Sequence, residues 1–176
     1  MRYLKVIAQD RCGNGKADSV LLEFREEVNA REDKLINSAL ALDINADGKV
    51  DFKFGDVTGD GMENALDQRL LQAFANTVIK LNWLNRGTTR KQYLKILAED
   101  LQGDGTPNIV RVHLRREDSF ESDGIMISWS AAFDRDNDGK LDFSFHGDAN
   151  GDGRIDQIDD RLVQRLAGLY LKFNWS

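Results

Sequence analysis

The chain is a tandem repeat, and no other feature of the sequence constrains its fold as strongly. The segment YLKVIAQD, which begins at Tyr3, returns as YLKILAED at Tyr93. The segments DGKVDF, GDVTGDG and LNW return in the same order as DGKLDF, GDANGDG and FNW, at an offset of 90 to 92 residues. A repeat of this length is a small module of its own rather than one turn of a solenoid. The sequence therefore predicts a first unit at residues 1–83, a linker at residues 84–92 and a second unit at residues 93–176.

Hydrophobic periodicity predicts several strands and one helix in each unit. Apolar residues alternate strictly along Ile127–Phe133, which is typical of a strand, and recur at helical spacing along Ile158–Leu166. We expect the two helices to end near Asn76 and Gly168, because Asn and Gly tolerate the left-handed conformation that follows a helix. The alternation along Leu169–Trp175 then predicts a last strand. The predicted fold class is α+β, with two tandem modules, each an antiparallel sheet of about five strands with one helix that follows an Asp- and Gly-rich loop.

The loop before each predicted helix has the oxygen spacing of an EF-hand calcium loop. With Asp148 as position 1, oxygen side chains follow at positions 3, 5, 9 and 12, and glycine stands at position 6. These positions direct their oxygens toward one centre, and the carbonyl of position 7 turns inward to join them. The predicted ligands are Asp56, Thr58, Asp60, Met62 (carbonyl), Asn64 and Asp67 in the first unit, and Asp148, Asn150, Asp152, Arg154 (carbonyl), Asp156 and Asp159 in the second.

A second, open loop lies just upstream in each unit, with the pattern D-x-[DN]-x-D-G-x-x-D. Its position 12 is Phe54 or Phe145, so position 9 must supply the last ligand. In both types of loop the second unit has four carboxylates and the first unit three, which predicts tighter binding in the second unit. The predicted ligands are Asp43, Asn45, Asp47 and Asp51 in the first unit, and Asp134, Asp136, Asp138 and Asp142 in the second.

A third, degraded copy of the loop opens each unit, between the first two predicted strands. In the second unit it runs from Asp100 to Asn108, and in the first unit from Asp10 to Asp18 with Cys12 at position 3. A hard cation does not select a thiol. Two alternatives stay open for both copies, namely a metal site and a hairpin turn held by Asp or Asn side chains without an ion.

The ligand types favour Ca²⁺ as the cofactor of the stronger loops. A hard divalent cation takes six to eight oxygens, and the loop before each predicted helix supplies carboxylate, amide and carbonyl oxygens in that number. Magnesium is less favoured, because it binds through few carboxylates and retains several waters. Zinc lacks its usual nitrogen and sulfur ligands here, since the chain has one cysteine and two histidines.

Parts of the chain resemble known calcium-binding families. The segments Asp56–Leu71 and Asp148–Leu162 resemble the loop-helix half of type I dockerin repeats, which also carry Asp at position 12. The open loops Asp43–Asp51 and Asp134–Asp142, together with Leu101–Val110, are similar to the calcium hairpins of FG-GAP and VCBS-type extracellular repeats. These resemblances imply calcium binding and an extracellular or cell-surface domain, but they specify no biological role.

Composition narrows the functional classes further. The net charge is −6 and no basic block is present, so we expect no nucleic-acid partner. No apolar run reaches the length of a membrane span, and the first residues lack the pattern of a signal peptide, which leaves a cytoplasmic location open. The two histidines, His113 and His146, belong to no recognisable catalytic arrangement, so we expect no enzymatic activity.

The sequence therefore favours a calcium-stabilised structural or interaction module. The alternative is an intracellular calcium sensor or buffer. A sensor hides an apolar groove, often rich in methionine, that calcium exposes. The chain has three methionines, which argues mildly against that alternative.

Overall fold

A computed structural model describes residues 1–176 apart from 30–31, 119–123, 151 and 176. The elements follow the same order in two similar halves of the chain. In order they are β1 (Arg2–Asp10), β2 (Ser19–Asn29), β3 (Glu32–Leu42), β4 (Phe52–Phe54), α1 (Ala65–Val78), β5 (Asn85–Arg86), β6 (Gln92–Glu99), β7 (Ile109–Arg116), β8 (Ile125–Phe133), β9 (Phe143–Phe145) and α2 (Gln157–Leu171).

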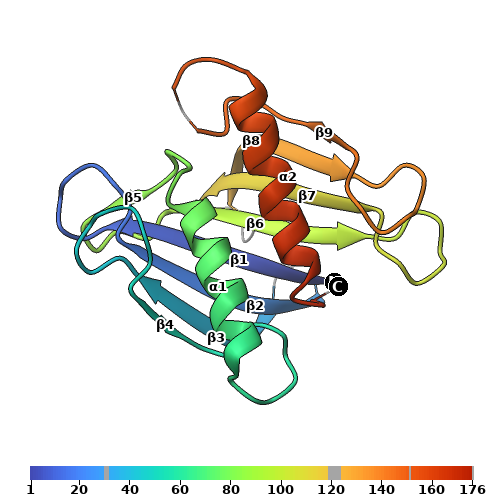
Figure 1. Cartoon of the computed structure of the whole chain (residues 1–176), viewed down its shortest axis with the longest axis horizontal. Helices are drawn as coiled ribbons and strands as arrows, with labels where there is room; N and C mark the ends of the chain where they lie inside the picture. Colours follow the sequence, from blue (N-terminus) through green and yellow to red (C-terminus); the bar gives the residue numbers. More distant parts are fainter. Residues whose placement is uncertain (30–31, 119–123, 151, 176) are drawn as a thin grey trace.

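The strands form one nine-stranded sheet that runs through both repeats (Figure 1). Its order is β4-β3-β2-β1-β6-β7-β8-β9, and the short β5 pairs with β1 in parallel. The prediction of two modules, each with its own sheet of about five strands and one helix, is therefore wrong. In such a module β1 or β6 would be an edge strand with a row of unpaired backbone groups. Here these two strands pair with each other, which removes both edges.

The seam between β1 and β6 lies on an approximate two-fold axis. Lys5 lies directly opposite Lys95, which is its counterpart in the second repeat. The neighbouring pairs exchange equivalent residues in the same way, so each repeat presents the same surface to the other, as in a symmetric dimer. The paired residues are Leu4 with Ile96, Lys5 with Lys95 and Val6 with Leu94.

The two lysines that face each other at the seam are neutralised across it. Each ammonium group lies over a tyrosine ring of the other repeat and forms an ion pair with a glutamate of the other repeat. Lys5 lies 4.4 Å from the Tyr93 ring centroid and 3.0 Å from Glu117, and Lys95 lies 4.3 Å from the Tyr3 ring centroid and 2.8 Å from Glu27. Lys95 is buried, and a buried ammonium group is stable only with such partners.

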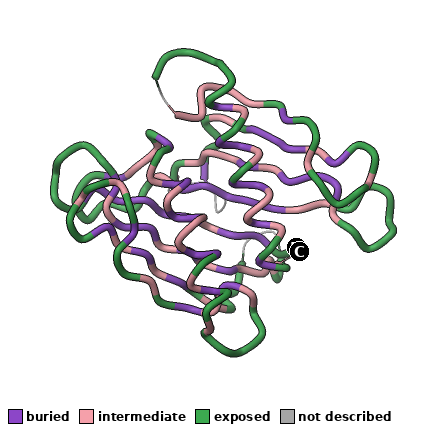
Figure 2. Tube along the Cα trace, viewed as in Figure 1, coloured by how far each residue is buried: buried purple, intermediate pink, exposed green. Residues whose placement is uncertain are grey.

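Both helices lie on the same face of the sheet and contact each other across the seam (Figure 1). Buried side chains of both repeats form one hydrophobic cluster, which includes Leu4, Phe24, Phe74, Ile96 and Phe173. Buried positions recur along the strands and helices of both halves of the chain (Figure 2). The repeats therefore share one core as well as one sheet. Neither described helix is long and apolar enough to cross a membrane.

Both helices extend beyond the ends that the sequence predicted. Asn76 lies inside α1 and Gly168 inside α2, and the helices end in right-handed C-caps at Ile79 and Lys172. Leu162, Leu166 and Tyr170 continue the buried stripe of α2 past Gly168, so packing outweighs the local preference of glycine. The left-handed residue after α2 is Asn174, with φ of 55°.

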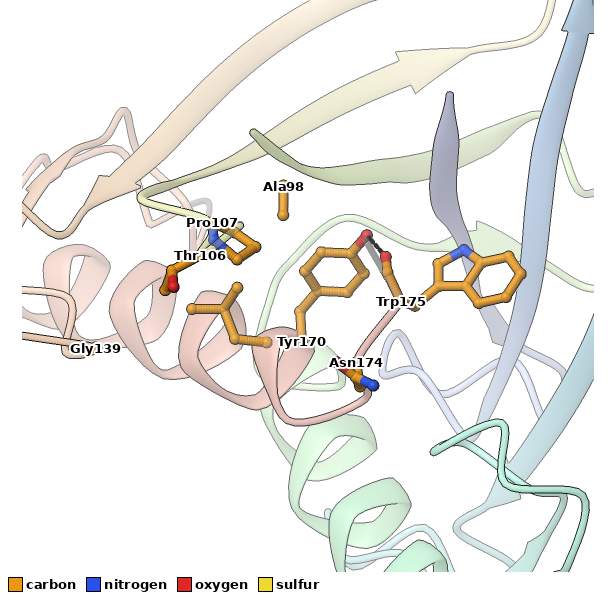
Figure 3. A pocket seen from close by; sticks show the side chains of 8 residues that line it. Ala98, Thr106, Pro107, Gly139, Tyr170, Asn174 and Trp175 are labelled. Carbon is orange, nitrogen blue, oxygen red and sulfur yellow. Dashed lines mark hydrogen bonds between the residues drawn. The ribbon is translucent and has the colours of Figure 1, made fainter. Parts of the chain in front are cut away.

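The predicted last strand along Leu169–Trp175 is also wrong, because its first half belongs to α2. Phe173 and Trp175 follow the helix and pack against Phe24 of the first repeat, with ring centroids 5.9 and 5.5 Å away. The indole of Trp175 donates a hydrogen bond to the carbonyl of Tyr3 at 3.1 Å, and Tyr170 donates one to the carbonyl of Trp175 at 2.7 Å (Figure 3). Alternating apolar residues here reflect a turn that folds back onto the core.

Gly55, which follows β4, provides a test of the close contact between the chain after β4 and Ala39 of β3. Its φ is +126°, and an added Cβ would lie 2.7 Å from the Cβ of Ala39. The counterpart Gly147 lacks a positive φ, and its added Cβ would meet only Ser128 Oγ at 3.5 Å. Gly55→Ala should lower the free energy of unfolding by about 3 kcal/mol, because it combines backbone strain with a clash. Urea unfolding measures this, and Gly147→Ala is the matched control, which should change little. Equal effects of the two substitutions would show that the clash is not real.

Candidate metal centres

Six similar loops surround the sheet. Four connect adjacent strands and lie in two pairs at opposite ends of the strands, whereas two lead from an edge strand into a helix (Figure 1). Within each pair the loops are joined by a backbone hydrogen bond, from Asp43 to the carbonyl of Asp18 at 2.9 Å and from Asp134 to the carbonyl of Asn108 at 3.0 Å. The pairing follows from the sheet order, which brings the β1–β2 loop beside the β3–β4 loop and repeats this in the second half.

Position 1 of every loop is an aspartate that holds the turn at position 6. Its carboxylate accepts the N–H of the glycine five residues later, and that glycine has φ between 83° and 89°, which favours glycine over every other residue. In the Asp100 loop, the hydrogen bond from the N–H of Gly105, together with that from Gly103, holds the pKa of Asp100 below its usual range. The pairs are Asp10 and Gly15 (2.7 Å), Asp43 and Gly48 (2.7 Å), Asp56 and Gly61 (2.8 Å), Asp100 and Gly105 (2.7 Å), Asp134 and Gly139 (2.8 Å), and Asp148 and Gly153 (2.8 Å).

Position 5 adds a second hydrogen bond that is common to all six loops. Its side-chain oxygen accepts the N–H of position 7 at 2.8 or 2.9 Å, which turns the chain after the glycine. The pairs are Asn14 and Lys16, Asp47 and Lys49, Asp60 and Met62, Asp104 and Thr106, Asp138 and Lys140, and Asp152 and Arg154. The degraded loops therefore share these two hydrogen bonds with the complete ones, and both alternatives for them, a metal site and a turn without an ion, stay open.

The last oxygen of the shared loop pattern closes each loop by accepting N–H groups from the beginning of that loop. In the hairpin loops this is position 9: Asp18 accepts from Arg11 and Cys12, Asp51 from Ile44 and Asn45, Asn108 from Leu101, and Asp142 from Arg135. In the helix loops it is position 12: Asp67 accepts from Val57 and Thr58, and Asp159 from Ala149 and Asn150. Positions 9 and 12 thus perform one task in two contexts. The sequence assigned each of them the last ligand of its loop, but it missed this hydrogen-bonding role. The shared signal was an Asp or Asn at the point where the next element begins.

In the helix loops, positions 9 and 12 also cap the helices. Asn64 and Asp156 are the N-cap residues, and Asp67 and Asp159 accept their backbone N–H groups to complete capping boxes. Both carboxyls are fully buried. Burial by itself raises their pKa, but the backbone hydrogen bonds outweigh it and hold the pKa of each carboxyl below its ordinary value, with help from the Thr58 hydroxyl for Asp67. Both groups are therefore ionised at neutral pH and present negative charge at a helix N-terminus.

Three loops bring three possible metal ligands together. In each, one ligand atom per residue lies within 4.8 Å of the others. The groups are Asp56, Asp60 and Asp67; Asp134, Asp136 and Asp138; and Asp10, Cys12 and Asp18. The last group is the poorest, because a hydrogen bond with Asp18 raises the pKa of the Cys12 thiol and keeps it protonated.

The other predicted carboxylate ligands belong to no such group among the described residues. Among the described residues, the Asp43–Asp51 and Asp148–Asp159 loops form no group of three such acidic ligand atoms, and Gly151, in the second of these loops, lies outside the described residues. Asp142 belongs to no such group and bonds instead to the Arg135 N–H. The Asp-rich groups that do converge can hold a metal ion, since their donors are carboxylate oxygens around a common point.

The buried carboxylates predict a pH dependence of stability in the presence of chelator. Because the pKa of Asp67 and Asp159 is lower in the folded state, their stabilisation is complete above the unfolded-state pKa of about 3.9 and is lost as the pH falls through the folded-state value. The urea concentration at the midpoint of unfolding should therefore decrease when the pH is lowered from 6 to 3. Asp67→Asn should flatten this dependence, and Glu63→Gln, an exposed neighbour, should leave it unchanged. An equal midpoint at both pH values would refute a stabilising role of the ionised Asp67 and Asp159 carboxylates.

Comparison with protein-family models, curated proteins and solved structures finds no match for this chain.

Proposed function

We propose that this chain is a calcium-binding protein in which the ions stabilise a structural or interaction module. The observation that carries the proposal is the convergence of Asp56, Asp60 and Asp67, with one oxygen of each within 4.8 Å of the others, in a loop whose Gly61 has the required turn. The same hydrogen-bond frame recurs in five further loops. A frame that directs several carboxylates inward without a cation would bring like charges together at an energetic cost.

The donor chemistry supports calcium rather than another metal. The converging group of Asp134, Asp136 and Asp138 offers oxygen atoms only, which favours hard cations. Zinc binds through histidine and cysteine, and neither belongs to this group or to that of Asp56, Asp60 and Asp67. Magnesium takes few protein carboxylates and keeps its waters, whereas these loops gather three carboxylates each. Bound calcium would neutralise the loops and supply a positive centre for their oxygens.

The structure of the loops favours a stabilising role over that of a sensor. Four of them join neighbouring strands of one sheet, and the other two begin the helices that cover the core. Their backbone is already ordered by the hydrogen bonds of positions 1, 5 and 9 or 12, so the ion would lock an existing conformation. A sensor instead uses calcium to separate helices and expose an apolar groove. An intracellular sensor or buffer is the second candidate, and the proposal includes no enzymatic activity.

A calcium titration of chelated protein distinguishes the two candidates. Near-ultraviolet circular dichroism and melting temperature report the gain in order, and a dye that binds apolar surface reports exposure. Because Phe54 and Phe145 are already exposed, the change in dye signal is the readout rather than its absolute value. A large rise in melting temperature without new dye binding supports the stabilising role. A rise in dye binding at micromolar calcium would favour the sensor, and no response in any signal would refute calcium binding.

A further inference from the structure

A groove with four basic side chains lies beside α2 in the second repeat. Its volume is about 630 Å³, and it runs between the exposed side of α2 and the end of the Asp134–Asp142 loop. Arg161, Arg165 and Lys172 line it from the helix, and Lys140 lines it from the loop. Such a concentration of positive charge is unexpected in a chain of net charge −6.

Three of these four cations have no partner in the described part of the chain. Lys140 lies 3.2 Å from Asp138, on an 83% exposed side chain, but Arg161, Arg165 and Lys172 form no ion pair with any described residue. Surface cations are commonly balanced by nearby acids. Unbalanced cations in a concave site focus a positive potential and attract anions.

The first repeat shows how the same space can be closed. There, Asn76 accepts the backbone N–H of Val50 at 2.9 Å, and Gln72 donates to the carbonyl of Val50 at 3.3 Å. These two side chains fill the gap between helix and loop. The residue that corresponds to Arg165 is Ala73, so the first repeat also lacks one of the cations.

In the second repeat the gap stays open. Gly168 replaces Asn76, and Gln164, the counterpart of Gln72, donates to Asp160 at 3.1 Å instead. Within the described residues, the N–H of Leu141, the counterpart of Val50, donates to no protein group. Neither backbone nor packing demands the glycine, since its φ is not positive and an added Cβ would meet no atom within 4 Å. A glycine inside a helix destabilises the helix relative to alanine, so its presence here favours a role for the open space.

We propose that this groove binds an extended acidic segment of a partner protein, with Arg161 and Arg165 pairing with its carboxylates. The two arginines are one helical turn apart, about 6 Å along the axis, which is close to the spacing of about 6.6 Å between alternate side chains of an extended peptide. From Arg161 to Lys172 the cations span about 16 Å, the length of about five extended residues. The guanidinium fork matches carboxylate geometry.

The groove is less suited to other anions. A single inorganic ion cannot reach cations that are spread over this length. Single-stranded nucleic acid binds through stacking on aromatic rings, and no described residue lining the groove is aromatic. A flat anionic membrane would bring its charges against the carboxylates of the adjoining Asp134–Asp142 loop. An acidic peptide can instead enter the groove and keep away from that loop.

Fluorescence anisotropy of the full chain in millimolar calcium tests the proposal. The probe is a labelled eight-residue peptide of alternating Glu and Ala, and the reference peptide has Gln in place of Glu. We expect saturable binding of the Glu peptide that weakens as salt is added, and a weakening of at least tenfold, about 1.4 kcal/mol, in the double variant Arg161→Ala with Arg165→Ala. Arg69→Ala, at the corresponding exposed position of α1, is the matched control and should bind as the wild type does.

Gly168→Asn provides a second test that does not remove any charge. It introduces the residue of the first repeat, so it should close the groove and weaken peptide binding, while the melting temperature stays the same or rises. The proposal is overturned if the Glu peptide does not bind, if the Gln peptide binds equally well, or if the double variant retains wild-type affinity. Displacement of the peptide by a single-stranded oligonucleotide at lower concentration would show nucleic acid to be the preferred ligand and would equally overturn it.

Discussion

In excess chelator, the protein is expected to melt about 10 to 20 °C below its melting temperature in millimolar calcium. Binding to the folded state alone adds about 2.7 kcal/mol for each site at a hundredfold excess over its dissociation constant. Two sites would thus add about 5 kcal/mol, which is comparable with the whole stability of many domains. For a chain of this size, each kcal/mol shifts the melting temperature by about 2 to 4 °C. Differential scanning calorimetry with and without chelator measures the difference.

Two substitutions in one loop distinguish the stability contributed by the bound ion from that contributed by the hydrogen bonds of the loop. Asp136 at position 3 converges with Asp134 and Asp138, but among the described residues its side chain accepts only a long hydrogen bond of 3.3 Å from the backbone N–H of Asp138. Asp136→Ala should therefore lower the melting temperature in calcium and change it little in chelator. Asp134→Ala also removes the acceptor of the Gly139 N–H, so it should lower the melting temperature both in calcium and in chelator. If Asp136→Ala had the same effect in both conditions, its carboxylate would not be a ligand.

Separated halves of the chain, residues 1–90 and 91–176, should not unfold cooperatively as monomers. Each would expose the edge of β1 or β6 and half of the shared core, and the first would lose the contact of Phe24 with Phe173 and Trp175. The exposed turn near Gly87 is a suitable place for the cut. Circular dichroism during urea unfolding, combined with sedimentation, gives both the transition and the mass.

The approximate two-fold axis makes a more specific prediction for these halves. Mixed in equal amounts, they should associate through the β1–β6 seam, and the first half alone should form a dimer in which β1 pairs with a second β1 about Lys5. Lys5→Glu should weaken the mixed complex, because it would place a negative charge beside Glu117, whereas exposed Lys34→Glu should not. Two monomeric halves with cooperative transitions would contradict the shared sheet and core.

The sequence predicts several local elements of this protein, because local patterns determine them, although the predicted strand along Leu169–Trp175 is wrong. The alternation along Ile127–Phe133 corresponds to most of β8, and the helical spacing along Ile158–Leu166 lies within α2. The arrangement of the repeats could not be predicted in this way. Repetition shows that β1 and β6 are alike, but the choice between exposed edges and mutual pairing depends on backbone groups that every residue carries.

The same distinction applies to the loops. Glycine at position 6 and aspartate at position 1 indicate the turn directly, and all six turns share a hydrogen bond from the N–H of position 6 to the carboxylate of position 1. The element that follows the loop decides which position closes it. Where a helix follows, position 12 (Asp67) lies back at the start of the loop, and where a strand follows, position 9 (Asp51) does. The convergence of ligand atoms is a three-dimensional property, and equal spacing does not ensure it, as the Asp148–Asp159 loop shows within its described residues.

The most direct test of calcium binding is isothermal titration of the decalcified chain with calcium, in parallel with the Asp136→Ala and Asp60→Ala variants. The account predicts at least two calcium ions per chain, bound more tightly than magnesium, and one ion fewer in each variant. Failure to bind calcium at millimolar concentration, or a stoichiometry that neither substitution changes, would contradict it.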